Sequence, residues 1–160
     1  MQIEIFTTGG TIDKLYFDAK SDYEVGDPQI VDLLREANLT LDYQVTSLMR
    51  KDSLEMTAAD RQQIRKAVEE SSALNIVITH GTDTMIETGK CLQSIIDKTI
   101  ILTGAMQPAR FRSTDAIYNV ASAITAVQTL PVGVYIAMNG QLFDPAQTRK
   151  NVEQNRFEFI

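Results

Sequence analysis

The sequence predicts a three-layer α/β/α domain built on a mostly parallel sheet with right-handed crossovers. Five short segments rich in apolar residues alternate along the chain with four longer segments of helical periodicity. Such alternation is typical of a parallel sheet that carries helices on both faces. The chain has 160 residues, of which 44% are hydrophobic, so we expect one domain with a single core over residues 1–160.

The predicted elements follow one another through short connections. Strands are expected at residues 2–7, 43–49, 75–79, 99–103 and 132–138, and helices at residues 28–36, 58–71, 84–97 and 114–128. Residues 14–26 are polar and lack a helical period, which favours a mobile hairpin or loop, and residues 157–160 are a candidate short edge strand. This arrangement is of the flavodoxin-like or Rossmann-like type.

Local signals predict where three of the helices begin. Pro28 suits the first position of a helix, because its missing N–H would have no partner there. Thr57 with Asp60, and Thr84 with Glu87, have the spacing of a capping box, in which the two residues satisfy each other's free N–H groups.

The composition limits the possible partners. Lys and Arg number 15 against 21 Asp and Glu, a formal net charge of −6 that argues against binding to nucleic acid or to an anionic membrane. Cys91 is the only cysteine and His80 the only histidine, so we expect no disulfide framework, no metal site and no cofactor. The N-terminus begins directly on a predicted strand, and a cytoplasmic protein that binds a small molecule is the expectation.

Hydroxyl side chains follow three of the predicted strands, at Thr11, Ser53 and Thr82. Ligands of open parallel sheets bind beyond the carboxyl ends of the strands, where N–H groups at a helix N-terminus favour an anion. A Thr or Ser hydroxyl is a weak nucleophile until a neighbouring base or an electropositive site activates it. Each of these residues, taken alone, also fits an ordinary role in a turn or a cap.

The chain offers few bases for such a hydroxyl. His80 lies two residues before Thr82 and is interpreted as a buried, hydrogen-bonded structural residue, so no His-based triad can be built. The remaining candidates are Tyr23, Asp83 and Lys150. Taken individually, Tyr23 also fits a packing residue, Asp83 a residue of the first turn of a helix, and Lys150 a solvated charge.

Taken together, these motifs resemble a known family. The segments TGGTI at residues 8–12 and HGTDTM at residues 80–85 look like the two signatures of the bacterial-type L-asparaginases. Residues 21–26 resemble the flexible lid with its tyrosine, and residues 52–56 resemble the loop that binds the substrate carboxylate. Residues 104–108 and 138–150 extend the match, which covers the family's N-terminal catalytic domain and resembles its short single-domain members.

The resemblance implies hydrolysis of L-asparagine to L-aspartate and ammonia through a threonine acyl-enzyme. Thr11 would be the attacking hydroxyl with Tyr23 beside it, and Thr82, Asp83 and Lys150 would position or activate the nucleophile or the water. Ser53 and Asp83 would hold the substrate's carboxylate and ammonium, within substrate-binding segments that include Asp52 and Gly81. Backbone N–H groups near Thr82 would form an oxyanion hole.

Two departures from the family pattern qualify these expectations. Leu54 stands where many members place a Gln that helps to bind the substrate ammonium, and the C-terminal domain, which lends an acidic residue to a neighbouring subunit, is absent from the sequence. We expect a homodimer to cover the open crevice. Two alternatives remain open: a deamidase of glutamine or another small amide, and a non-catalytic domain that binds an acidic amino acid. The net negative charge of the chain argues against binding to tRNA.

Overall fold

A six-stranded sheet forms the centre of the fold. The computed structural model describes residues 1–19 and 22–160. The strand order is β4-β1-β5-β6-β7-β8, in which the first five strands are parallel and β8 runs antiparallel to β7. The strands are β1 (Gln2–Gly9), β4 (Asp42–Lys51), β5 (Asn75–Thr79), β6 (Thr99–Thr103), β7 (Gly133–Met138) and β8 (Gln141–Phe143). The predicted α/β class with a mostly parallel sheet is confirmed.

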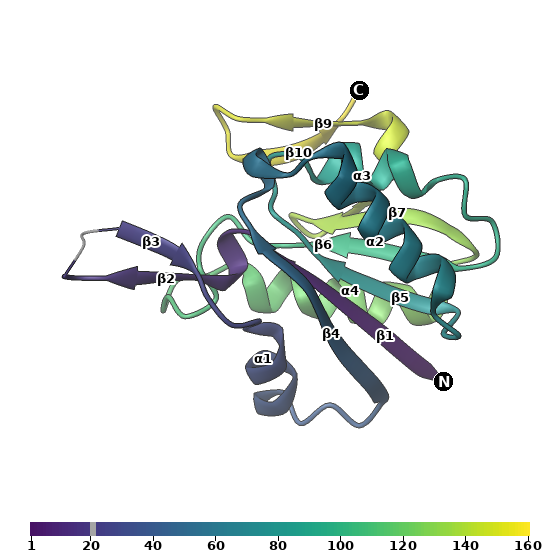
Figure 1. Ribbon diagram of the computed structural model, residues 1–160, viewed down its shortest axis with the longest axis horizontal. Helices are drawn as coiled ribbons and strands as arrows, with labels where there is room; N and C mark the ends of the chain where they lie inside the picture. The colour runs from purple at the N-terminus through teal and green to yellow at the C-terminus, as the bar shows by residue number, and fades with distance from the viewer. Residues whose placement is uncertain (20–21) are drawn as a thin grey trace.

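Four helices cover the two faces of this sheet and complete three layers (Figure 1). They are α1 (Ile30–Glu36), α2 (Ala58–Glu70), α3 (Met85–Leu92) and α4 (Ala116–Thr129). In β1, Ile3 and Ile5 join the core beneath α1 and α4, whereas Phe6 joins the core beneath α2 and α3. Because both faces are covered, β5 and β6 are almost entirely buried, as expected for central parallel strands.

Two hairpins extend from this body (Figure 1). The segment predicted as a hairpin or loop forms β2 (Lys14–Phe17) and β3 (Asp22–Val25), which confirms the hairpin. Residue 21, with which the expected lid segment begins, lies outside the described residues. At the C-terminus, β10 (Arg156–Phe159) pairs antiparallel with β9 (Thr148–Asn151). The closing segment therefore forms a strand in a two-stranded sheet of its own, and not an edge of the central sheet.

Three predicted helix boundaries differ from the observed ones by two residues or more. α1 begins at Ile30 and not at Pro28, because the first carbonyl to accept a helical hydrogen bond is that of Gln29, from the Leu33 N–H at 3.1 Å; the Gln29 N–H is itself bound by the Asp13 carboxylate. α4 begins at Ala116 and not at residue 114. α3 ends at Leu92 and not at residue 97, and its expected capping box does not form. The Thr84 hydroxyl instead donates to the Ser53 carbonyl at 2.8 Å.

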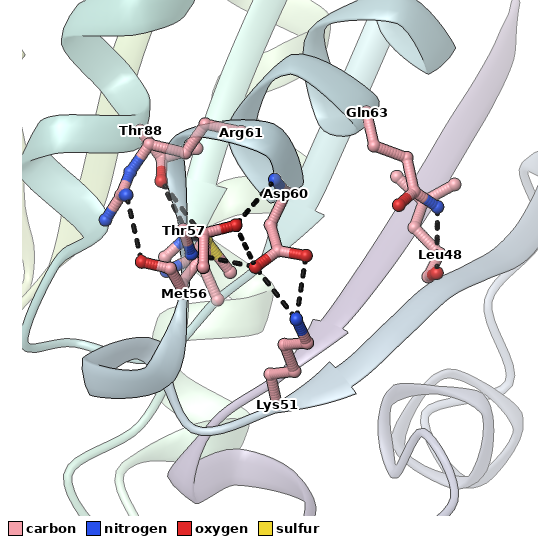
Figure 2. Close-up of polar contacts among 9 residues, drawn as sticks. Leu48, Lys51, Met56, Thr57, Asp60, Arg61, Gln63 and Thr88 are labelled. Atoms are coloured by element: carbon pink, nitrogen blue, oxygen red, sulfur yellow. Dashed lines mark hydrogen bonds and ion pairs between the residues drawn. The ribbon is translucent and has the colours of Figure 1, made fainter.

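The capping box of α2 is present and is reinforced by an ion pair. The Thr57 hydroxyl accepts from the Asp60 N–H at 3.2 Å, and Asp60 accepts from the Thr57 N–H at 2.8 Å. Lys51, the last residue of β4, donates to both Asp60 oxygens at 2.8 and 2.9 Å (Figure 2). Hydrogen bonds from Lys51 and Thr57 lower the pKa of Asp60 to about 2. The connection from β4 to α2 is thus fixed at both ends.

None of the described helices is long and apolar enough to cross a membrane.

Candidate active site

Three turns meet at the carboxyl edge of the sheet. They follow β1, β4 and β5, which are adjacent parallel strands, so their ends lie side by side. The first turn is a 3-10 turn at Thr11–Asp13, the second a 3-10 turn at Ser53–Glu55, and the third leads from His80 into α3. The hydroxyl-bearing residues predicted at strand ends therefore gather at one edge.

Glycines bring the three turns into direct contact. A Cβ atom on Gly10 would lie 2.5 Å from both Cα and N of Gly81, and one on Gly81 would lie 2.6 Å from Cβ and Oγ of Ser53. Gly10 also has φ +88°, a conformation that disfavours residues with a side chain. Gly10 therefore packs against the backbone of Gly81, and Gly81 packs against Ser53, with Thr11 and Thr82 next to these contacts in the sequence.

Lys150 reaches this edge from β9 and joins two of the predicted residues. Its Nζ donates to Oγ1 of Thr82 at 2.8 Å and to Oδ1 of Asp83 at 2.6 Å. The Lys150 side chain is only 13% exposed. Because Lys150 donates, the Thr82 oxygen accepts, and the proton of the Thr82 hydroxyl is left for another acceptor.

A second ion pair links the β2–β3 hairpin to the turn after β4. Lys14 Nζ donates to Oδ2 of Asp52 at 2.7 Å, while Oδ1 of Asp52 accepts from the Leu54 N–H. Partial burial raises the pKa of Asp52, but the hydrogen bonds from Lys14 and Leu54 and the positive charges of Lys14 and Lys150 together hold it below its usual range. Asp52 therefore stays ionised and engaged within the protein.

Ser53 is the most enclosed of the predicted substrate-binding residues. Its side chain is buried beneath Gly81, and its hydroxyl accepts from the Thr84 N–H at 3.4 Å. Its carbonyl accepts from the Thr84 hydroxyl. Ser53 thus joins the turn after β4 to the start of α3.

The structure does not join Tyr23 to Thr11 by a hydrogen bond among the described residues. Tyr23 is 46% exposed on the hairpin, and its ring packs in tilted orientation against Tyr16 and Phe111, with centroids 5.2 and 6.3 Å apart. Thr11 is partly buried, and its hydroxyl has no partner within residues 1–19 and 22–160. Thr11 is therefore available to a ligand, and Tyr23 belongs to an aromatic cluster with Tyr16 and Phe111.

The family model for the asparaginase N-terminal domain matches residues 2–159. The chain belongs to the asparaginase family. It is 32% identical to a glutaminase-asparaginase of Acinetobacter glutaminasificans over 142 residues, which are 83% of this chain and 41% of that protein. It is also 32% identical to a glutamyl-tRNA(Gln) amidotransferase subunit of Methanococcus vannielii over 154 residues, 89% of this chain and 35% of that protein.

Solved structures agree with the family assignment. The thermostable L-asparaginase from Thermococcus kodakarensis superimposes with a TM-score of 0.86 at 26% identity, over 100% of this chain and 51% of that one. The chain therefore spans between a third and about a half of the length of these relatives.

His80 is a buried structural residue in this chain. Nδ1 of His80 lies 2.8 Å from the Gly81 carbonyl, which can only accept, so Nδ1 carries the proton; Nε2 then accepts from the Thr88 hydroxyl at 2.8 Å. Burial lowers the pKa of His80 to about 4, although the Gly81 carbonyl acts in the opposite direction. His80 is therefore neutral near pH 7.

This hydrogen bond also orients the peptide between Gly81 and Thr82. Carbonyl and N–H groups of a trans peptide point in opposite directions. Since the Gly81 carbonyl is turned inward to His80, the Thr82 N–H is turned away from it, and this N–H has no acceptor among the residues that the structure describes. It is the kind of free donor that can stabilise an oxyanion.

Sequence reasoning missed Asp13, which connects the Thr11 turn to the hairpin and to α1. Its carboxylate accepts from the Gln29 N–H at 2.8 Å, and its carbonyl accepts from the Gly26 N–H at 2.8 Å. Burial raises the pKa of the Asp13 carboxyl to about 7, against the lowering effects of the Gln29 N–H and the charge of Arg50. An isolated Asp at the start of a polar segment carried no signal of this role.

The Asp13 carboxyl yields a prediction about stability. Between its ordinary pKa of 3.8 and about 7, the folded protein holds a proton that the unfolded chain has released, so this group's contribution to stability falls as pH rises. The amide introduced by Asp13→Asn cannot titrate. The free energy of unfolding of Asp13→Asn minus that of wild type should rise by on the order of 2 kcal/mol from about pH 5 to about pH 8.

Urea unfolding at the two pH values checks this difference. Asp97→Asn removes an exposed carboxylate and serves as the control, with the same difference at both pH values. A pH-independent difference for Asp13→Asn would show that Asp13 is ionised throughout the range.

Proposed function

We propose that this chain hydrolyses the side-chain amide of L-asparagine to L-aspartate and ammonia, with Thr11 as the nucleophile. The observation that carries the proposal is the contact of Lys150 with Thr82 and Asp83 beside the Gly10–Gly81 contact, in a member of the asparaginase family. Hydrolysis of an amide through an acyl-enzyme requires three groups close to the amide carbon: a free hydroxyl as nucleophile, a donor to the oxyanion and a group that transfers protons.

In the proposed first step, the Thr11 oxygen attacks the amide carbon. The proton of the Thr11 hydroxyl passes to the leaving nitrogen, ammonia departs, and an ester between Thr11 and the acyl group remains. The N–H of Thr82 binds the oxyanion of the tetrahedral intermediate, and this role is supported by the His80 hydrogen bond that orients the peptide. Water then cleaves the ester and restores Thr11.

Lys150 and Asp83 act on Thr82 in this proposal. Lys150 donates to the Thr82 oxygen, so the Thr82 proton is directed to a water or to the leaving nitrogen, and Asp83 holds the Lys150 ammonium in place. Tyr23 closes over Thr11 from the hairpin, and Asp52, Ser53 and Gly81 shape the floor of the substrate site. We propose these roles for the residues that the sequence singled out.

A second candidate substrate is glutamine. It is favoured by a relative whose name is glutaminase-asparaginase. Ammonia release from L-asparagine, L-glutamine and their D-forms tests the proposal. If none of these amides releases ammonia, the remaining alternative is a non-catalytic domain that binds an acidic amino acid. Calorimetry with aspartate would detect such binding.

We also propose that the chain folds as one domain and forms a two-fold homodimer in the cytoplasm. The dimer is supported by α4, which carries no charged residue and exposes Ile117 and Tyr118. A closed dimer is the simplest symmetric assembly. Light scattering at micromolar concentration should give twice 17.8 kDa, and the monomer mass alone would contradict the dimer.

The cytoplasmic location agrees with the single free Cys91, and cell fractionation tests it.

Thr11→Ala should lower kcat by at least about 1,000-fold, because it removes the attacking oxygen. The melting temperature should stay close to that of wild type, since the Thr11 hydroxyl holds no other group of the described chain. Thr40→Ala, at an exposed position before β4, is the matched control and should keep full turnover. Near-wild-type kcat in Thr11→Ala would assign the attack to another group.

Lys150→Met should lower kcat by about 100-fold to 10,000-fold, the usual effect of losing a positioned proton-transfer group. Arg149→Met is the control, because it removes the neighbouring cation, which is exposed and paired with Glu158. Steady-state kinetics that separate kcat from KM check the pair. An unchanged kcat in Lys150→Met would mean that Thr82 acts without the ammonium.

A further inference from the structure

Asp13 is a buried acidic residue that the proposed mechanism does not use. It is the last residue of the 3-10 turn Thr11–Asp13, two positions after the proposed nucleophile, and it is only 2% exposed. A carboxyl group is costly to bury unless it makes specific contacts. The partners of Asp13 therefore indicate what this residue does.

The contacts of Asp13 reach the segments on both sides of the nucleophile. Its N–H donates to the Gly10 carbonyl at 3.1 Å, which closes the turn around Thr11. Its carbonyl accepts at 2.8 Å from the N–H of Gly26, the residue after β3. Its Oδ1 accepts at 2.8 Å from the N–H of Gln29, the residue before α1. Asp13 thus holds the turn that carries Thr11 to the end of the hairpin and to the start of α1.

Gln29 extends this junction to a loop that is distant along the chain. Gln29 is 4% exposed, and its Oε1 accepts from Nε of Arg110 at 2.7 Å. The residue after Arg110 is Phe111, whose ring packs against that of Tyr23. The junction of Asp13 and Gln29 therefore connects the three segments that carry Thr11, Tyr23 and Phe111.

The surroundings of the Asp13 carboxyl favour its neutral form. Burial raises its pKa to about 7, against the lowering effects of the Gln29 N–H and of Arg50 on β4. Asp27, in the segment before α1, is paired with Arg50 at 2.7 Å and acts on Asp13 in the opposite direction to Arg50. An asparagine side chain is also neutral and can accept from the Gln29 N–H, whereas alanine offers no acceptor.

We propose that Asp13 is a positioning residue for the hydrolysis, and that its side chain, through the N–H of Gln29, sets where the Thr11 hydroxyl lies relative to the hairpin. The inference rests on the proposed reaction at Thr11 and adds to it a residue that acts through its neighbours and not on the substrate. A displacement of about 1 Å at a reacting group can lower turnover by about 100-fold. Ser53 and Asp83, the residues proposed to hold the substrate, lie on other turns, so the loss of Asp13 should change kcat and not KM.

The kinetics of ammonia release from L-asparagine test the proposal at neutral pH and well below the melting temperature of each variant. Asp13→Ala should lower kcat by about 100-fold and leave KM within about threefold of wild type. Asp13→Asn restores an acceptor for the Gln29 N–H and should keep kcat within about threefold of wild type. Asp97→Ala, at an exposed position before β6, is the control and should keep both constants.

Asp13→Ser repeats the test with a polar side chain that is one bond too short to reach the Gln29 N–H. It should lower kcat by at least about tenfold, and it decides the question if Asp13→Ala does not fold. Amide hydrogen exchange shows whether the junction itself has loosened. The N–H groups of Gly26 and Gln29 should exchange at least about tenfold faster in Asp13→Ala or Asp13→Ser than in wild type, and at the wild-type rate in Asp13→Asn.

The outcomes separate this inference from the proposed function. An unchanged kcat in Asp13→Ala or Asp13→Ser, a change confined to KM, or an equal loss of kcat in Asp13→Asn would overturn the inference and leave the proposed function intact. A loss of kcat without faster exchange at Gly26 and Gln29 would also overturn it, because Asp13 would then act by another route. A wild-type protein that releases no ammonia from L-asparagine would overturn both.

Discussion

The close approach of Gly10 to the backbone of Gly81, and of Gly81 to Ser53, is the constraint on which the site depends. No side chain fits between these turns, since a Cβ atom at either glycine would overlap a neighbouring backbone or side-chain atom. Their adjacency follows from the strand order, because β1 lies between β4 and β5. The parallel sheet thus aligns the three turns at one edge, and the two glycines allow these turns to come into contact.

Ion pairs then attach segments that the sheet does not hold. Lys150 is supplied by a hairpin outside the central sheet and reaches residues 68 and 67 positions earlier. Lys14 fixes the start of the β2–β3 hairpin to Asp52. Both pairs are partly shielded from solvent, where electrostatic interactions are stronger than at an exposed surface. The two ion pairs therefore join segments that lie far apart along the chain to the turns at the edge of the sheet.

The sequence predicted the five parallel strands of the sheet well, but it missed the antiparallel strand β8 and placed several ends of the helices poorly. Strands buried on both faces, such as β5 and β6, are continuous apolar runs that local composition reveals. The starts of α1 and α3 depend on distant groups: Asp13 binds the Gln29 N–H, and Ser53 takes the Thr84 hydroxyl. No local pattern encodes such partners: the capping box of α2 forms as predicted, whereas the one with the same spacing at α3 does not, because the Thr84 hydroxyl is bound to the Ser53 carbonyl.

The predicted site shows the same division between motif and tertiary contact. The motif at residues 80–85 located Thr82 and Asp83, and the contact with Lys150 agrees with their grouping. The place of Tyr23 among Tyr16 and Phe111 was not foreseen, because Phe111 belongs to a loop that is distant along the chain. Asp13 ties the Thr11 turn to the base of that hairpin through the Gly26 N–H, and its carboxylate fixes the start of α1. The two ends of the hairpin are thus both anchored, Lys14 by Asp52 in the turn after β4 and Gly26 by the Asp13 carbonyl in the Thr11 turn.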